Sequence, residues 1–247
     1  MPTTTGAILA GGLGTRLRTV VADRPKVLAE VLGKPFLARL LDQLADAGLK
    51  RVVLLTGYRS EQVEESFGRE YRGMSLDYSV EPAPLGTAGA LRLAMPKLFP
   101  STISVGRPAS GTVLVMNGDS YCSADLRRFR ASHENLPPGH ASLVLTEVPD
   151  TSRFGKVEFA ADDRVERFLE KQEAGGKGWI NAGIYLIDRP LVEQIPTGRA
   201  VSIEREMFPA WSQRQVLHAF PGAGSFLDIG TPESYRAAEA FFSRRAA

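Results

Sequence analysis

Residues 5–18 of this 247-residue chain read TGAILAGGLGTRLR, an apolar run that leads into a glycine-rich turn and then arginines. The run at positions 5–10 has the length and composition of a buried strand. The glycines at 11, 12 and 14 allow the backbone N–H groups to point toward one spot, an arrangement that binds anions. The stretch therefore predicts a strand followed by an anion-binding turn.

Cations follow the glycines directly. Arg16 and Arg18 come next, and Pro25-Lys26 adds a third cation within the same connection. Guanidinium groups bind phosphate in a fixed fork geometry, so this set favours a polyphosphate ligand. The Gly-Lys-Ser/Thr ending of a P-loop is missing, and no glycine three residues after Gly14 completes the dinucleotide fingerprint. A strand-to-helix turn that merely needs glycine is the alternative.

Outward from this turn, strands and helices alternate. We expect strands at 51–57, 76–81 and 113–116, and helices at 36–48, from an N-cap at Ser60 onward, and at 87–98. The second half predicts strands at 156–159, 165–169, 180–187, 216–220 and 226–229, with helices near 202–211 and 232–242. Residues 100–111, rich in Ser, Pro and Gly, predict a mobile loop.

This order predicts an α/β fold: a single-domain, Rossmann-like three-layer sandwich with a mostly parallel mixed sheet. We expect one domain over residues 1–247, with a nucleotide-binding half at about 1–120. The strand-rich remainder, about 121–247, should extend the same sheet.

Composition excludes several protein classes. The chain is 43% hydrophobic and 23% charged with a formal charge of +2, which argues against disorder and against a nucleic-acid groove. A single cysteine, Cys122, excludes an internal disulfide and a zinc site built on several cysteines. The N-terminus lacks the basic segment of a signal peptide, and no apolar run approaches the roughly 20 residues of a membrane span. We therefore expect a cytoplasmic protein that works on neither nucleic acid nor membrane.

Further motifs follow in a set order. They are GGLGTRL at 11–17 with Pro25-Lys26, EPAPLGTAG at 81–89, Asn-Gly-Asp at 117–119, Phe-Gly at 154–155, Glu-Lys at 170–171, Asn-Ala-Gly at 181–183 and Asp-Ile-Gly at 228–230. Each alone is weak evidence, but together, over residues 5–242, the chain resembles the sugar-1-phosphate nucleotidylyltransferases (nucleotide-sugar pyrophosphorylases). Gln172 departs from the pattern, because the family often has proline after Glu-Lys.

The resemblance implies transfer of a nucleotidyl group from a nucleoside triphosphate to a sugar 1-phosphate, with release of pyrophosphate. The segments RTVVADRPK at 18–26 and FLDIGTPESYRAAEAFF at 226–242 are most similar to guanylyltransferases that act on D-glycero-D-manno-heptose 1-phosphate. Guanylyl transfer to mannose 1-phosphate is the second interpretation, and uridylyl or thymidylyl transfer is a further alternative. These small molecules are the implied partners, and a homo-oligomer is compatible with the sequence.

The implied chemistry needs cations rather than a general base, because a phosphate oxygen is already anionic at neutral pH. In the family's pattern Arg16 binds the leaving β- and γ-phosphates, Lys26 the α-phosphate and Lys171 the sugar phosphate. The histidines that lie in no motif, expected at the surface or partly buried, are His133, His140 and His218.

A divalent cation, Mg²⁺ or Mn²⁺, is also implied, held by carboxylates, phosphate oxygens and water. Asp119 and Asp228 each follow a predicted strand, where ligands of open α/β sheets gather. Each aspartate alone could cap a turn, but the resemblance makes the pair metal ligands, whereas Asp125 is expected near the start of a helix. The positions that match the family's sugar-phosphate contacts are Gly155, Glu170, Lys171 and Asn181. Glu170 could instead be a solvated charge at a strand edge.

One residue, Glu81, is expected to determine which nucleotide base is bound. Relatives that use uridine or thymidine triphosphate commonly carry glutamine where Glu81 stands, whereas a carboxylate can accept from both N1–H and N2–H₂ of guanine. The alternative is that Glu81 points to solvent and a backbone group binds the base. The nucleotide-binding positions implied by the resemblance are Leu9, Gly11, Gly12, Gly14, Thr15, Glu81, Gly86, Thr87 and Gly118.

Two other classes fit less well. A glycosyltransferase would need an Asp-x-Asp metal motif, whereas this chain has Asn117-Gly118-Asp119 and keeps Lys26. A non-catalytic nucleotide-sugar sensor would be expected to have lost Arg16, Lys26 or a metal aspartate. All are present, so an enzyme is the better interpretation.

Overall fold

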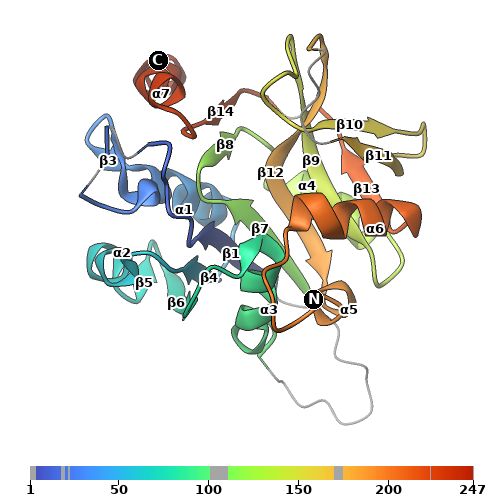
Figure 1. Ribbon diagram of the computed structural model, residues 1–247, viewed down its shortest axis with the longest axis horizontal. Coiled ribbons are helices and arrows are strands. Elements are labelled where there is room, and N and C mark those ends of the chain that lie inside the picture. The colour runs from blue at the N-terminus through green and yellow to red at the C-terminus, as the bar shows by residue number, and fades with distance from the viewer. Residues whose placement is uncertain are drawn as a thin grey trace.

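The predicted first strand, β1 (Thr5–Ala10), lies in the middle of a ten-stranded sheet (Figure 1). The computed structural model describes residues 4–17, 20–21, 23–100, 111–169, 175–222 and 224–246. The strands of the first half are β4 (Arg51–Thr56), β5 (Glu70–Tyr71), β6 (Met74–Val80) and β7 (Thr112–Asn117). Those of the second half are β9 (Ala141–Val148), β10 (Lys156–Phe159), β11 (Val165–Leu169), β12 (Gly178–Asp188) and β13 (Leu217–Phe220).

The sheet is mixed, as predicted. Strands β6, β4, β1 and β7 lie side by side and pair in parallel. From β12 onward the second half continues the same sheet by antiparallel pairing with β7, β9 and β10, while β13 adds a parallel edge on β9. Strand β9, which forms the longest run of pairs with β12, was not predicted.

Helices cover both faces of the sheet, which confirms the three-layer architecture. On one face lie α1 (Phe36–Asp46), α2 (Ser60–Phe67), α4 (Leu126–Glu134) and α7 (Pro232–Ala246). On the other lie α3 (Gly86–Leu98), α5 (Arg189–Glu193), the π-helical segment η2 (Ile203–Met207) and α6 (Phe208–Gln213). The short elements are the 3₁₀ turn η1 (Lys26–Leu28), β2 (Glu30–Val31), β3 (Lys34–Pro35), β8 (Ser120–Cys122) and β14 (Phe226–Asp228).

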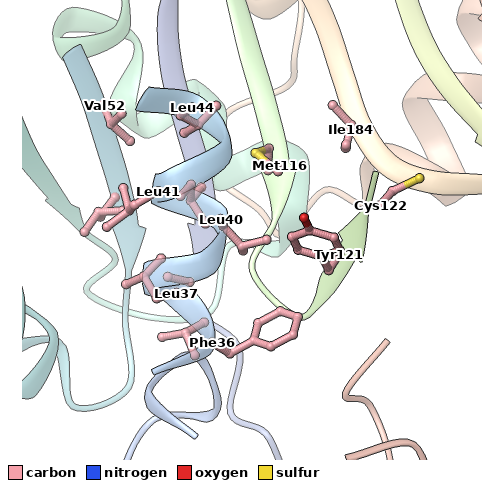
Figure 2. Close-up of a cluster of buried hydrophobic side chains, with 14 of the residues drawn as sticks. Phe36, Leu37, Leu40, Leu41, Leu44, Val52, Met116, Tyr121, Cys122 and Ile184 are labelled. Carbon is pink, nitrogen blue, oxygen red and sulfur yellow. The ribbon is translucent and has the colours of Figure 1, made fainter. Parts of the chain in front are cut away.

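The central strands bury both of their faces, which explains their continuous apolar sequences. Ile8 of β1 packs into the core under α1, whereas its neighbour Ala7 packs into the core under α3. This alternation is the two-residue period of a strand. Figure 2 shows the first core, in which Phe36, Leu37, Leu40, Leu41 and Leu44 of α1 meet the sheet.

Leu40 offers a test of this packing. Its side chain is fully buried between α1 and the sheet. We expect Leu40→Ala to lower the free energy of unfolding by about 2–5 kcal/mol, because the substitution leaves a cavity in a close-packed core. Urea unfolding followed by circular dichroism measures this. Leu40→Met, which conserves volume, is the matched control and should cost less than about 1.5 kcal/mol. Equal losses in both variants would contradict the packing argument.

Two local predictions were wrong. Ser60 does not cap α2 with its side chain: Arg59, with φ of 52°, turns the chain so sharply after β4 that Ser60 is already helical. His133 is not at the surface but 5% exposed, and its ring contacts Ser142 Oγ at 2.7 Å and Asp188 Oδ1 at 3.2 Å. It continues the buried stripe of α4 after Leu126 and Phe129, a helical spacing that explains its burial.

The prediction that Asp125 lies near the start of a helix was confirmed. Asp125 caps α4, because its Oδ1 accepts from the N–H groups of Arg127 and Arg128 at 3.1 and 3.0 Å. Residues 101–110 of the expected mobile loop lie outside the described residues. Within the described ranges, no helix is both long and apolar enough to span a membrane.

Candidate active site

The predicted glycine turn lies where the order of strands along the sheet reverses. Strand β1 has β4 on one side and β7 on the other, and all three run in parallel. Leu9 lies opposite Asn117 in the β1–β7 pair, so the turns that begin at Gly11 and Gly118 emerge side by side. Ligands of open α/β sheets bind at such a switch point, beyond the carboxyl ends of the strands.

A cavity of about 350 Å³ opens at this edge and gathers most of the predicted nucleotide-binding positions. Predicted residues that line it are Leu9, Gly11, Gly12, Lys26, Glu81, Gly86, Thr87, Gly118 and Asp119. Gly14 and Thr15 lie in the adjoining turn, where Gly14 has φ of 58°. The sequence thus predicted a set of residues from four separate segments that the fold brings to one cavity.

Glycine is required at position 118 because two backbones approach closely there. The Gly118 N–H donates to the Leu9 carbonyl at 3.0 Å. A Cβ atom on Gly118 would overlap that carbonyl oxygen and lie 2.9 Å from Val27 Cγ1. The absence of a side chain at Gly118 therefore allows the ends of β1 and β7 to approach closely.

Lys26 and Asp119 form an ion pair in the cavity wall. Lys26 Nζ lies 2.7 Å from Asp119 Oδ2, and the two side chains are 12% and 41% exposed. Burial raises the pKa of Asp119, but the charge and hydrogen bond of Lys26, the Ser120 hydroxyl and the charge of Arg16 outweigh it and hold that pKa below its ordinary value. The carboxylate is therefore ionised at neutral pH.

The guanidinium group of Arg16 lies close to the ammonium group of Lys26. A Cβ atom built on Gly230 would lie 2.7 Å from Asp228 Oδ1, 3.8 Å from Lys26 Nζ and 3.9 Å from Arg16 Nη2. The two predicted catalytic cations and the second predicted metal ligand therefore converge around Gly230. Arg18 lies outside the described residues.

The two aspartates are held by one small sheet. Strand β14 pairs with β8 so that Asp228 lies opposite Ser120, and the Ile229 N–H donates to the Asp119 carbonyl at 2.8 Å. Asp228 Oδ1 also accepts from the Gly230 N–H at 2.9 Å, so this side chain does cap its own turn. Oxygen-only carboxylate donors fit Mg²⁺, which takes one or two carboxylates and completes its shell with phosphate and water. Within the described ranges, no group of three or more His, Cys, Asp or Glu side chains gathers to hold a metal.

Glu81 also lines the cavity and does not simply point to solvent. Its Oε2 accepts from the Leu85 N–H at 2.8 Å, and its Oε1 lies against Gly11, where any Cβ atom would overlap it. Burial raises the pKa of Glu81, and the Leu85 hydrogen bond only partly offsets this. The carboxylate is thus held in the cavity wall with lone pairs left for a ligand.

The predicted sugar-phosphate positions are only partly described. Asn181 uses its amide within the protein: Nδ2 donates to Tyr185 Oη at 2.8 Å, and Oδ1 accepts from the Gly183 N–H at 2.9 Å. Gly155 directly precedes β10, next to the ring of Phe154. Glu170 and Lys171 lie outside the described residues.

Sequence reasoning missed three polar side chains of this site. Arg153 Nη2 lies 3.3 Å from Asp228 Oδ2, and Glu204 and Asn117 line the cavity. Asn117 belongs to the Asn-Gly-Asp motif, but no role was predicted for its side chain. Glu204 fell inside a predicted helix, where no sequence signal distinguishes it from its surface neighbour Glu206. Only the contact between η2 and α3 reveals it.

Comparisons with known proteins agree with this geometry. Residues 5–245 match the family model described as nucleotidyl transferase. The chain is 36% identical to mannose-1-phosphate guanylyltransferase of Mycobacterium tuberculosis over 231 residues, 92% of this chain and 61% of that protein. It is 34% identical to D-glycero-alpha-D-manno-heptose 1-phosphate guanylyltransferase of Aneurinibacillus thermoaerophilus over 232 residues, 94% of this chain and 95% of that protein.

One solved structure is similar to this chain over almost its whole length. The crystal structure of HddC from Yersinia pseudotuberculosis complexed with GMP-PN matches with a TM-score of 0.79 and 33% identity, over 97% of this chain and 100% of that chain. The chain spans about 60% of the length of the mannose-1-phosphate guanylyltransferases that it matches. By its matched length and its similarity to these relatives, the chain belongs to the nucleotidyl transferase family.

Proposed function

We propose that the protein transfers a guanylyl group from GTP to a sugar 1-phosphate of the manno configuration. The observation that carries the proposal is the convergence of Arg16, Lys26, Asp119 and Asp228 at the carboxyl edge of the sheet. Two cations beside two carboxylates suit a reaction in which two anions must meet. We assign nucleotide binding mainly to about residues 1–120 and sugar-phosphate binding to about 121–247.

In the proposed reaction an oxygen of the sugar phosphate attacks the α-phosphorus of GTP. The bond from the α-phosphorus to the bridging oxygen of the β-phosphate breaks, and pyrophosphate leaves with that electron pair. No proton has to be removed from the nucleophile, so the residues act by position and charge. Lys26 neutralises charge at the α-phosphate, and Arg16 neutralises charge that grows on the leaving pyrophosphate.

Asp119 and Asp228 would hold a divalent cation in this scheme. Bound there, Mg²⁺ would neutralise phosphate charge and orient the triphosphate. Asp119 also sets the position of Lys26 through their ion pair. Arg153, which contacts Asp228, adds a positive charge on the side from which we expect the sugar phosphate to enter.

We assign the choice of base to Glu81. The carboxylate end that faces the cavity can accept from N1–H and N2–H₂ of guanine but would meet the O4 acceptor of uracil with repulsion. Two relatives named guanylyltransferases support GTP as the nucleotide substrate. The mismatch is worth about 1–3 kcal/mol, the usual cost of an unpaired buried polar group.

Glu81→Gln tests the assignment of the base. We expect the unmodified protein to favour GTP over UTP in kcat/KM by about 10–100-fold, and the variant to lose most of this ratio. Steady-state kinetics with both nucleotides measures it. Glu65→Gln, at an exposed position of α2, should leave the ratio unchanged. Equal kcat/KM for GTP and UTP in the unmodified protein would defeat the assignment.

For the sugar we propose D-glycero-D-manno-heptose 1-phosphate first and mannose 1-phosphate second. The relative named for the heptose substrate matches over nearly its whole length, which favours this order. A pyrophosphate-release assay over GTP, UTP, dTTP, ATP and CTP, each with heptose, mannose and glucose 1-phosphates, tests the function. Release only with GTP and a manno sugar supports it. A tenfold preference for glucose 1-phosphate would overturn the sugar, and no release with any pair would overturn the reaction.

A further inference from the structure

Glu204 is a carboxylate in the cavity wall to which neither the motifs nor the proposed mechanism assigns a task. It lines the cavity together with Lys26, Asn117 and Asp119. In the described part of the chain it forms no ion pair, and its partners are the hydroxyls of Thr87 at 3.1 Å and Ser202 at 3.3 Å, both on Oε2. A carboxylate has about four acceptor sites, so Glu204 keeps capacity for donors from a ligand.

The surrounding structure holds Glu204 rigidly. The N–H of Val201 donates to the Leu85 carbonyl at 2.8 Å, and the Val201 carbonyl accepts from the Ala88 N–H at 3.0 Å. The Thr87 hydroxyl accepts from the Ile203 N–H at 2.8 Å and donates to Glu204. The segment that carries Glu204 is thus bonded to the first turn of α3. The segment is π-helical. π-Helical turns are rare in proteins overall, but those that occur are often found at functional sites.

Keeping this carboxylate in the wall costs free energy. Burial raises the pKa of Glu204, and hydrogen bonds from its own backbone N–H and from the Thr87 and Ser202 hydroxyls only partly offset this, while the negative charge of Asp119 adds a smaller increase. Replacing such a group by an apolar one would relieve the cost unless a ligand uses it. A buried carboxylate with a raised pKa in a cleft is a candidate for ligand binding.

The position of Glu204 relative to the sheet indicates which part of the ligand it meets. Glu81 lies against Gly11 and Gly57, which follow β1 and β4. The segment that carries Glu204 lies instead toward β12: Phe208, which directly follows η2, packs on Tyr185 of β12 with ring centroids 5.0 Å apart, and the Tyr185 hydroxyl contacts Asn181. Because the strand order is β4, β1, β7 and β12, Glu81 lies toward the β4 side of the sheet edge and the segment of Glu204 toward the β12 side, with Lys26 and Asp119 also in the cavity wall.

We propose that Glu204 binds hydroxyl groups of the sugar, on the part of the sugar away from its phosphate, and so determines which sugar is accepted. This inference rests on the proposed function, in which the base lies at Glu81 and the phosphates lie at the cations. A carboxylate repels phosphate and accepts only from donors, and the sugar offers hydroxyls. A site built to accept from a hydroxyl rejects the analogue that lacks it.

Glu204→Gln is the sharpest test, because glutamine keeps the size of the side chain and can still accept from Thr87 and Ser202. We expect the KM for mannose and heptose 1-phosphates to rise at least about tenfold while the KM for GTP changes less than about twofold. Glu206→Gln is the matched control: this residue lies on the same segment but pairs with Arg199 at 2.7 Å. Both KM values of the control should match the unmodified protein.

Deoxy sugars give a second readout that needs no variant. Mannose 1-phosphate lacking one hydroxyl at a time should show a position whose loss raises the KM of the unmodified protein about tenfold or more but leaves Glu204→Gln unaffected. A purely structural role for Glu204 would not produce this pairing. Equal rises in both KM values, or no sensitive hydroxyl, would overturn the proposal.

Failure of the proposed function is detected separately. If the unmodified protein releases no pyrophosphate with any pair, calorimetric titration with mannose 1-phosphate decides the role of Glu204 without turnover. Binding to the unmodified protein that Glu204→Gln weakens at least about tenfold supports the proposal. Equal binding to both proteins, or none to either, overturns it.

Discussion

Replacing Asp119 by asparagine should lower kcat by at least about 100-fold, the scale of losing a charged group that acts on the transition state. The carboxylate holds Lys26 at 2.7 Å and lies beside Asp228 through the β8–β14 pair. An amide keeps the size of the side chain but removes the negative charge that both Lys26 and a divalent cation need. Steady-state pyrophosphate release with saturating GTP and sugar 1-phosphate measures the effect.

The matched control for this variant is Asp77→Asn. Asp77 also forms an ion pair, with Arg51 at 2.7 Å, but lies outside the cavity lining. Its kcat should stay within about twofold of the unmodified protein, because exposed ion pairs contribute little.

Removal of divalent cations by EDTA should abolish turnover, and Mg²⁺ should restore it. Undiminished turnover in EDTA would show that Asp119 and Asp228 hold no essential metal.

Replacing Lys26 by alanine is the second large effect, and we expect kcat to fall by about 100-fold while the KM for GTP rises much less. Lys26 is only 12% exposed and its ammonium is directed at Asp119. In the proposed reaction it meets the α-phosphate most closely as that phosphorus changes partners. An interaction made mainly in the transition state lowers kcat when it is lost.

Lys34→Ala separates this effect from the loss of any lysine. Lys34 pairs with Asp42 away from the cavity, so kcat should be unchanged in that variant. Circular dichroism and a melting temperature should accompany both variants, because Lys26→Ala leaves the charge of Asp119 without its partner. A rise in KM alone would make Lys26 a uniform binding residue and contradict its proposed role.

The first half of the fold was readable from local sequence. The buried strands at 5–10 and 51–56 are short apolar runs, and α1 shows helical spacing up to its end before Gly48. These patterns follow from the periods of strand and helix alone. Strand β9 escaped prediction although both of its faces are buried, because a short apolar run does not by itself distinguish a strand from a helix.

The residues of the candidate site also fall into two groups: those that local sequence predicts and those that only the fold brings together. Glycines and cations in the turn after β1 are contiguous and carry their chemistry in their own sequence. Arg153 and Glu204 do not: each is an ordinary charged residue until the chain brings it to Asp228 or to Thr87. The expectation that Ser60 caps α2 failed for a related reason, because the left-handed backbone of Arg59 starts the helix earlier.

The sequence by itself determined the alternation of strands and helices, the glycine turn after β1 and the cations that follow it, since these depend on spacing within a few residues. Tertiary structure decided how the carboxylates come together at the carboxyl edge of the sheet. Asp119 and Asp228 meet through the β8–β14 pair, and Glu204 enters through hydrogen bonds between η2 and the start of α3. The physical reason is that burial and charge proximity give a carboxylate its environment, and both arise from segments that are distant in sequence and meet only in the packed fold.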